Sequence, residues 1–209
     1  MRSMDIPAPA PGEDRHRALA LANSRLSMPS GVVDLLGDPA AGIEWLVGHG
    51  LAPADGMIGE PCAARLRAFR ESTRGLLAAY TSQTAPDPAD LAAVNTALTT
   101  MPAAALLEWD AGNGPHRTER LSADRLADTA IARLAAETAD LLTGSDAPSL
   151  AACGSPGCTR FFLRTHAARQ WCGTRCGDRV RAARHYAKRT GRDEQAATGA
   201  SITASTTPA

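Results

Sequence analysis

Four cysteines near the C-terminal end of the sequence constrain its fold more than any other feature. Cys153, Cys158, Cys172 and Cys176 follow the pattern C-x4-C, thirteen intervening residues, then C-x3-C. Two close pairs with this spacing can bring four thiolates to one ion in a tetrahedron, with Zn–S distances of about 2.3 Å. Four thiolates leave no open position for water or substrate, so the spacing predicts one structural Zn²⁺ and not a catalytic one.

Other chemistry is available to the same residues. Redox switching or two disulfides are alternatives, but neither pair has the C-x-x-C spacing of thiol oxidoreductases and the N-terminus has no secretion signal. His166 or His185 could replace a cysteine as a ligand. Because four better ligands are present, we expect His166 in a turn and His185 on a helix surface.

The residues around the cysteines are strongly basic. Residues 153–189 contain nine Lys or Arg and one acid, a net charge of +8, whereas residues 1–152 contain 12 Lys or Arg and 19 Asp or Glu, a net charge of −7. A basic segment attached to an acidic body is typical of proteins that bind a polyanion. DNA is the expected partner, and RNA is possible because phosphate attraction does not distinguish the two.

The rest of the sequence predicts an α+β protein in two parts. Residues 15–148 are expected to form a mainly helical domain with one β-hairpin, and residues 151–190 a small zinc module. Residues 1–14, rich in Pro and Ala, are expected to be a disordered leader, and residues 191–209 a disordered tail. No segment approaches the about 20 apolar residues of a membrane span, so we expect a cytoplasmic protein without a membrane partner.

Caps and turns place the elements of the helical part. Helices are predicted near residue 15, after Pro61, and from Ser122 to Gly144. Asp-Pro pairs at 38–39 and 87–88 predict two more helix starts. Apolar runs on both sides of residues 112–115, Gly-Asn-Gly-Pro, predict the β-hairpin.

The zinc module is predicted to contain a knuckle, a β-hairpin and a basic C-terminal helix. Residues 161–163 are the expected first strand and residues 169–171 the returning strand, with Trp171 and one phenylalanine as its core. From Gly177 the pattern is helical, with a thin apolar stripe at Val180, Ala183 and Ala187. The basic residues expected to contact nucleic acid are Arg169, Arg175, Arg179, Arg181, Arg184 and Lys188.

This pattern resembles the CGNR zinc finger, whose second knuckle reads Cys-Gly-Asn-Arg. The similarity lies in Cys153 and Cys158, Phe162-Leu163, Arg169-Gln170-Trp171-Cys172 and Cys176-Gly177-Asp178-Arg179. Upstream, Leu21-Ala22-Asn23-Ser24, Trp45-Leu46 and Leu66-Arg67-x-Phe69-Arg70 are similar to the ABATE domain that accompanies this finger. The resemblance implies a stress-related, mainly bacterial, transcription regulator with zinc on the four cysteines.

Two positions depart from the family pattern. Asp178 stands where the family has Asn, and Arg164 where it has Asp after the Phe-Leu pair. Neither is a zinc ligand. Asp178 keeps an acceptor and is expected to cap backbone amides or to pair with Arg175 or Arg181.

These observations favour a DNA-binding regulator over three rivals. The module could bind RNA, or its basic helix could dock on the acidic body or on a protein partner. An enzyme is not expected, because the sequence of residues 1–152 shows no nucleophile–base pair, phosphate loop or carboxylate–histidine cluster. The sequence identifies neither a small-molecule ligand of the N-terminal domain nor a homodimer interface.

Overall fold

The computed structural model describes residues 6–28, 31–100, 106–112, 114–118 and 125–203. Its elements in chain order are α1 (Arg17–Ala22), β1 (Arg25–Met28), β2 (Gly31–Asp34), α2 (Pro39–Gly48), α3 (Glu60–Ser82), α4 (Pro88–Thr100), β3 (Leu106–Asp110), β4 (Gly114–Thr118), α5 (Leu126–Thr143), β5 (Leu150–Ala152), β6 (Phe161–Leu163) and α6 (Thr174–Thr203). The strands form three antiparallel pairs, β1–β2, β3–β4 and β5–β6. The α+β, mainly helical class predicted from the sequence is confirmed.

The Asp-Pro pairs begin helices as predicted. The Asp38 carboxylate accepts a hydrogen bond of 2.8 Å from the Ala41 N–H at the start of α2. Asp87 accepts one of 2.8 Å from Ala89 at the start of α4. Each aspartate satisfies an amide that the first helical turn leaves without a backbone partner, which fixes where the helix begins.

Helices α3, α4 and α5 form the core of the helical body. On α5 the buried stripe is the one that the helical period indicates: Leu126, Ala130, Leu134, Thr138 and Leu141. Leu126, Ala130 and Leu134 of this stripe pack with apolar residues of α3 and α4, among them Leu66, Phe69 and Val94, in one cluster. The predicted Ser122 cap lies outside the described residues, and the described helix begins at Leu126.

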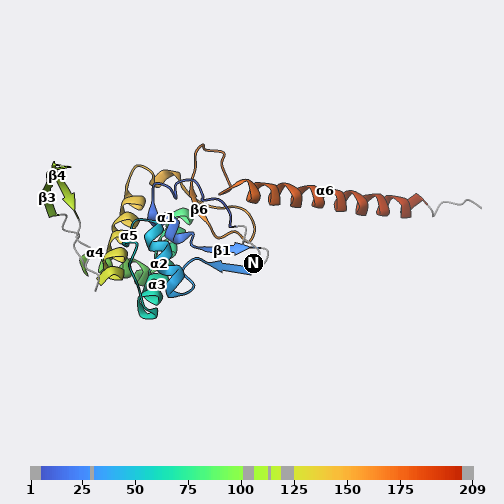
Figure 1. Ribbon diagram of the computed structural model, residues 1–209. Helices are drawn as coiled ribbons and strands as arrows, with labels where there is room; N and C mark the ends of the chain where they lie inside the picture. Colours follow the sequence, from blue (N-terminus) through green and yellow to red (C-terminus); the bar gives the residue numbers. More distant parts are fainter. Residues whose placement is uncertain (1–5, 29–30, 101–105, 113, 119–124, 204–209) are drawn as a thin grey trace, which may run out of the picture.

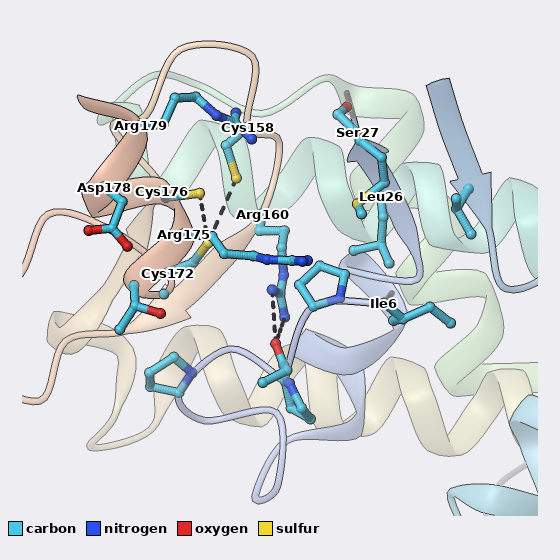
Figure 2. A pocket seen from close by; sticks show the side chains of 18 of the residues that line it. Ile6, Leu26, Ser27, Cys158, Arg160, Cys172, Arg175, Cys176, Asp178 and Arg179 are labelled. Atoms are coloured by element: carbon cyan, nitrogen blue, oxygen red, sulfur yellow. Dashed lines mark hydrogen bonds between the residues drawn. The ribbon is translucent and has the colours of Figure 1, made fainter. Parts of the chain in front are cut away.

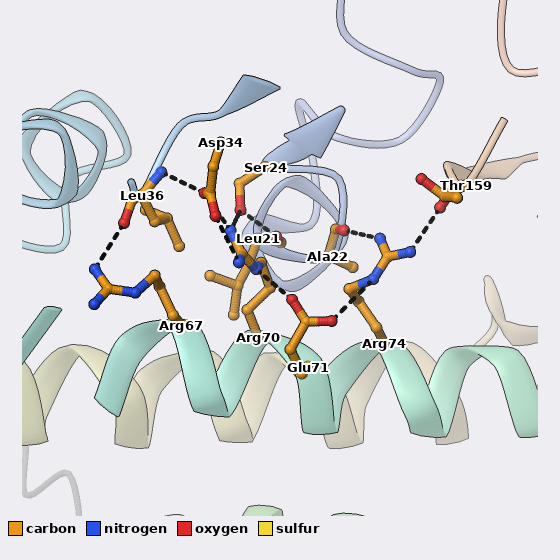
Figure 3. Close-up of polar contacts among 10 residues, drawn as sticks. All are labelled: Leu21, Ala22, Ser24, Asp34, Leu36, Arg67, Arg70, Glu71, Arg74 and Thr159. Atoms are coloured by element: carbon orange, nitrogen blue, oxygen red, sulfur yellow. Dashed lines mark hydrogen bonds and ion pairs between the residues drawn. The ribbon is translucent and has the colours of Figure 1, made fainter. Parts of the chain in front are cut away.

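The β1–β2 hairpin was not predicted and is held to α3 by a partly buried ion pair (Figure 3). The Arg70 side chain, only 4% exposed, donates through both terminal nitrogens to the Asp34 carboxylate, with one contact of 2.9 Å. Its Nε donates to Glu71 at 3.0 Å. A two-stranded hairpin is marginal alone, so this pairing and the packing of Leu26 position β1–β2 against the body.

The ion pair predicts acid-sensitive stability. Burial alone would raise the pKa of Asp34, but hydrogen bonds from Arg70 and the Leu36 N–H outweigh it, so the pKa lies below its ordinary value. The stabilisation is therefore present above the unfolded pKa of about 4 and is lost as the pH falls through the folded value. In urea unfolding, Asp34→Asn should cost about 2 kcal/mol at pH 7, the usual contribution of hydrogen bonds to a charged group, and progressively less below pH 4. Asp55→Asn, at an exposed loop position, is the control, and an equal cost at both pH values would contradict the assignment.

Strands β5 and β6 join the cysteine-rich segment to the helical body. The alternation of a strand sends Phe161 and Leu163 of β6 into an apolar cluster with Leu19, Leu77 and Leu141 of the helices. Phe162, fully buried between them, faces the opposite way and packs with Cys153, Cys172 and Cys176. One three-residue strand thus belongs to two cores, and the zinc module shares its packing with the helices.

The described part of the leader is ordered, contrary to the prediction for residues 1–14. Ala10 is buried in the cysteine cluster, and the Pro11 carbonyl accepts a hydrogen bond of 2.8 Å from the Leu163 N–H. The Ala8 carbonyl accepts two from Arg160, each of 3.0 Å. These groups satisfy donors of β6 and its preceding loop, which explains why a Pro-Ala segment is held in place. Residues 1–5 lie outside the described residues.

Helix α6 and the β3–β4 hairpin project from opposite sides of the body (Figure 1). The hairpin forms where it was predicted, but β4 begins at Gly114, inside the predicted turn, so that Trp109 lies opposite Pro115. The predicted disordered tail is wrong for residues 191–203, because α6 continues to Thr203; residues 204–209 lie outside the described residues. Within the described ranges, none of the helices has the length and apolar character needed to cross a membrane.

Candidate metal centre and basic helix

The first cysteine pair lies in the loop of the β5–β6 hairpin. The Cys153 N–H donates to the Arg160 carbonyl at 2.9 Å, which closes the loop, and the Cys158 N–H donates to the Ser155 carbonyl at 3.0 Å. Gly157 has φ of +74°, a left-handed conformation that residues with a Cβ rarely adopt. The turn therefore brings the two sulfurs to the same side of the hairpin.

The second pair spans the start of α6. The helix begins at Thr174, three residues before the predicted start, so Cys176 lies in its first turn. The Cys172 N–H donates to Cys153 Sγ at 3.4 Å, which links the two knuckles directly.

The prediction of a returning strand at residues 169–171 is wrong, because these residues form no strand. β6 pairs with β5, with Phe162 opposite Ala151. The Gln170 carbonyl accepts one hydrogen bond, of 3.0 Å, from the Gly154 N–H of the first knuckle. Segment 169–171 thus supports the loop that carries the first cysteine pair, and it does not extend the sheet.

The four sulfurs converge as a metal site requires. Figure 2 shows three of them, those of Cys158, Cys172 and Cys176. All four Sγ atoms lie within 4.8 Å of one another, and the distances from Cys172 Sγ to Cys158 Sγ and to Cys176 Sγ are both 3.7 Å. A tetrahedron with Zn–S bonds of about 2.3 Å has edges of about 3.8 Å. The spacing and the all-thiol donor set therefore fit Zn²⁺.

The thiols perturb each other's ionisation strongly. A hydrogen bond from the Cys158 thiol lowers the pKa of Cys153, and the same contact raises the pKa of Cys158 to about 11. Hydrogen bonding to Cys153 also raises the pKa of Cys172. Four adjacent thiols cannot all ionise without a cation, so zinc binding must release protons and its affinity must fall as the pH falls.

The two histidines near the site are separate from it, as predicted. The described metal-binding group consists of four cysteines and contains no histidine. His166 is exposed in the turn where its carbonyl accepts from the Arg169 N–H at 3.0 Å, and His185 is exposed on α6.

Two of the predicted nucleic-acid residues support the metal site. Arg169 donates to the Trp171 carbonyl at 3.1 Å, and its guanidinium lies 5.8 Å from the centre of the Phe162 ring. Arg179 donates to the Pro156 carbonyl at 3.2 Å and so ties α6 to the first knuckle. Both side chains therefore have a structural role in addition to their charge.

Arg181, Arg184 and Lys188 lie on the projecting part of α6, whereas Arg175 lies in its first turn. Arg181 forms an ion pair of 2.6 Å with Asp178, the residue that replaces the family's Asn. This is one of the pairings expected for Asp178. Arg184 and Lys188 are exposed, and so are the other residues from 181 to 189. The predicted packed stripe is therefore wrong at Ala183 and Ala187, because the helix leaves the body before it reaches them.

Sequence reasoning missed the residues that connect the metal site to the body. The Asn23 amide pairs with both backbone groups of Phe161: its Nδ2 donates to the carbonyl and its Oδ1 accepts from the N–H, each at 2.8 Å. Arg74 of α3 donates to the Ala22 carbonyl and, at 3.1 Å, to the Thr159 carbonyl next to Cys158. Asn23 belongs to the Leu-Ala-Asn-Ser motif that carried the family resemblance, and that motif was its one sequence signal.

Comparison with known families agrees with this architecture. Residues 15–145, more than half of the chain, match the ABATE family model, which is described as "Putative stress-induced transcription regulator". The chain belongs to the ABATE family. In this ABATE protein, residues 149–189 match the CGNR zinc finger, so the four-cysteine cluster is a structural zinc site. No match was found among curated proteins.

Proposed function

We propose that this ABATE-family protein is a zinc-dependent, DNA-binding transcription regulator. Cys153, Cys158, Cys172 and Cys176 hold one structural Zn²⁺, and the basic face of α6 contacts DNA. A four-thiolate zinc site needs reduced cysteines, which supports a cytoplasmic location. Neither family description names an enzymatic activity.

The observation that carries the proposal is the exposed, cationic and projecting part of α6. The helix has 30 residues and is therefore about 45 Å long, enough to follow a DNA groove well beyond the body. Arg181, Arg184 and Lys188 follow one another at helical spacing, so one face of the helix presents several cations. The zinc site fixes the first turn of this helix and so sets the direction in which it leaves the body.

The rival in which the basic helix docks on its own acidic body is disfavoured. Residues 181–189 are exposed, and the helix leads away from the body in Figure 1. RNA binding uses the same cations, so it becomes an outcome of the experiment: a preference for structured RNA over duplex DNA at equal salt would replace DNA as the partner.

The test is binding of the zinc-loaded protein to random duplex DNA over a salt series. If five cations contact phosphates, log K should fall with log[salt] at a slope of about −4.5. Replacing Arg181, Arg184 and Lys188 by Gln should reduce the magnitude of this slope by about 2.7 and weaken binding at every salt concentration.

The control removes three positive charges from the helical body. Arg15, Arg65 and Arg125 are exposed, with surface ion pairs whose loss costs little stability. Replacing them by Gln gives the same net charge as the α6 variant. If both triple variants lose the same affinity and slope, the effect comes from overall charge and the assignment to α6 is wrong.

A further inference from the structure

Asp178 is the one acidic residue among residues 153–189, and it lies on the helix proposed to contact DNA. Its Oδ1 accepts a hydrogen bond of 2.6 Å from Nη2 of Arg181, three residues further along the helix. The two side chains are 69% and 60% exposed, and an ion pair with that exposure contributes little to stability. Folding therefore does not explain why a carboxylate stands on this basic helix, and the pair is accessible to a ligand.

A second feature fixes the position of the Arg181 guanidinium. A Cβ on Gly177 would lie 3.1 Å from its Nη1 and 3.4 Å from the Trp171 ring. The guanidinium thus lies against Gly177, where a side chain would crowd it, in the N-terminal direction that helical side chains take. The neighbouring Cys176 belongs to the metal cluster in the first turn of α6, so the zinc site determines where this arginine lies.

Arg181 differs in this respect from the other cations on the projecting part of α6. Among the residues that the structure describes, Arg184 and Lys188 have no ion-pair partner. A phosphate contact depends mainly on charge, but the Asp178 carboxylate offsets the charge of Arg181 and is itself repelled by phosphate. A contact with a base edge depends on how the donors are oriented, and a carboxylate holds a guanidinium in one orientation. The pair therefore suits a base contact better than a phosphate contact.

The ion pair leaves donors of Arg181 available to a base. Within the described ranges its side chain makes one hydrogen bond, through Nη2, although a guanidinium carries five N–H donors in a planar fork. Nη1 and the second hydrogen of Nη2 can donate side by side. Two parallel donors match O6 and N7 of guanine in the major groove of DNA, where the other three bases do not present two acceptors.

We propose that Arg181 reads a guanine in the major groove of duplex DNA, with Asp178 and Gly177 as its positioning residues. This contact rests on the proposed function, because it belongs to the same interface between α6 and DNA. Arg184 and Lys188 are then phosphate contacts. A guanidinium in the groove also offsets backbone charge, so the salt slope does not separate the two kinds of contact, and base preference must be measured.

The experiment selects bound duplexes from a random-sequence pool with the full, zinc-loaded chain. We expect a preferred site in which replacing one guanine by adenine weakens binding by roughly 10- to 100-fold. At the same position, 7-deazaguanine keeps the pairing with cytosine but lacks the N7 acceptor, and it should weaken binding by roughly tenfold.

Two variants with the same loss of charge assign this contact. Arg181→Gln should bind the guanine and 7-deazaguanine duplexes with equal affinity, because the side chain that distinguishes them is gone. Arg184→Gln should weaken binding to both duplexes and keep the roughly tenfold difference between them. Both residues are exposed, and zinc content checks that the module is folded. If Arg181→Gln still responds to 7-deazaguanine as the natural sequence does, another residue reads this base and the assignment is wrong.

Asp178→Ala separates orientation from charge. Removing the carboxylate makes α6 more cationic, so random duplex DNA should bind more tightly, whereas the preference for guanine should shrink by roughly fivefold. Asp55→Ala, at an exposed loop position of the body, changes the net charge equally and should leave the preference intact. Tighter binding of Asp178→Ala with an unchanged guanine preference would contradict the positioning role.

The regulator function and the guanine contact can be told apart. DNA binding without a preferred guanine would leave the proposed function standing and overturn the contact. No binding to any duplex at low salt would overturn both. A preference for structured RNA would also overturn the contact, because the deep, narrow major groove of an RNA helix does not admit side chains.

Discussion

Replacing Cys172 by serine is expected to abolish stoichiometric zinc binding and to unfold the zinc module. Cys172 Sγ lies 3.7 Å from two of the other sulfurs, and its backbone N–H bonds the third, so it is the most connected member of the site. Zinc binding contributes about 10–16 kcal/mol to the folding of small zinc modules, and losing one thiolate removes much of that. Metal content measured by native mass spectrometry should fall from one zinc per chain to none.

Amide hydrogen exchange of the same variant should show which parts of the protein lose their folded structure. Amides of β5, β6 and the first turn of α6 should lose protection, because Phe162 and the cysteines form one buried cluster. The amides of α3, α4 and α5 should stay protected, since their cluster contains no cysteine. Cys62→Ser is the control, because Cys62 lies outside the metal cluster. Retention of one tightly bound zinc by Cys172→Ser would contradict the ligand assignment.

Asn23→Ala should destabilise the protein by roughly 2–6 kcal/mol and loosen the zinc module from the helices. The substitution leaves the buried N–H and carbonyl of Phe161 without their side-chain partner, and each orphaned group costs about 1–3 kcal/mol. The free energy of unfolding from urea titration measures the cost.

Zinc affinity distinguishes this role from a general loss of stability. Asn23 touches β6 and not the sulfurs, so Asn23→Ala should still bind one zinc, while the exchange of β6 amides becomes faster. The matched control is Asn95→Ala, an exposed position on α4, with an expected change within about 0.5 kcal/mol. Equal stability of the two variants would mean that Asn23 does not join the two parts.

Much of the metal site could be predicted from the sequence because its determinants are local. The spacing of the four cysteines limits how their sulfurs can converge, and the structure brings all four within 4.8 Å. Helix starts at Asp38 and Asp87 follow from a side chain that caps amides only two or three residues away. Likewise, the helical period of α5 identified its buried face without any knowledge of what packs on it.

The partners of short segments could not be predicted in this way. Strand β6 has only three residues, too few for periodicity to indicate its neighbour, and it pairs with β5 instead of residues 169–171. The Pro-Ala leader has a composition typical of disorder, yet it is held in place because the Leu163 N–H and the Arg160 guanidinium donate hydrogen bonds to its Pro11 and Ala8 carbonyls. The apolar stripe of α6 at Ala183 and Ala187 is a similar case. Helical spacing shows that these alanines share a face, but it does not show whether another part of the protein packs against that face.

The zinc ligands, the basic helix and the helical class could thus be inferred from residue types and spacing, since each depends on residues close together in the chain. The attachment of the zinc module to the helices depends instead on contacts between distant parts of the chain. Asn23 bonds Phe161 across 138 residues, and Arg160 reaches Ala8 across 152. Contacts at such separations depend on how the whole chain packs, and no local pattern of residue types encodes them.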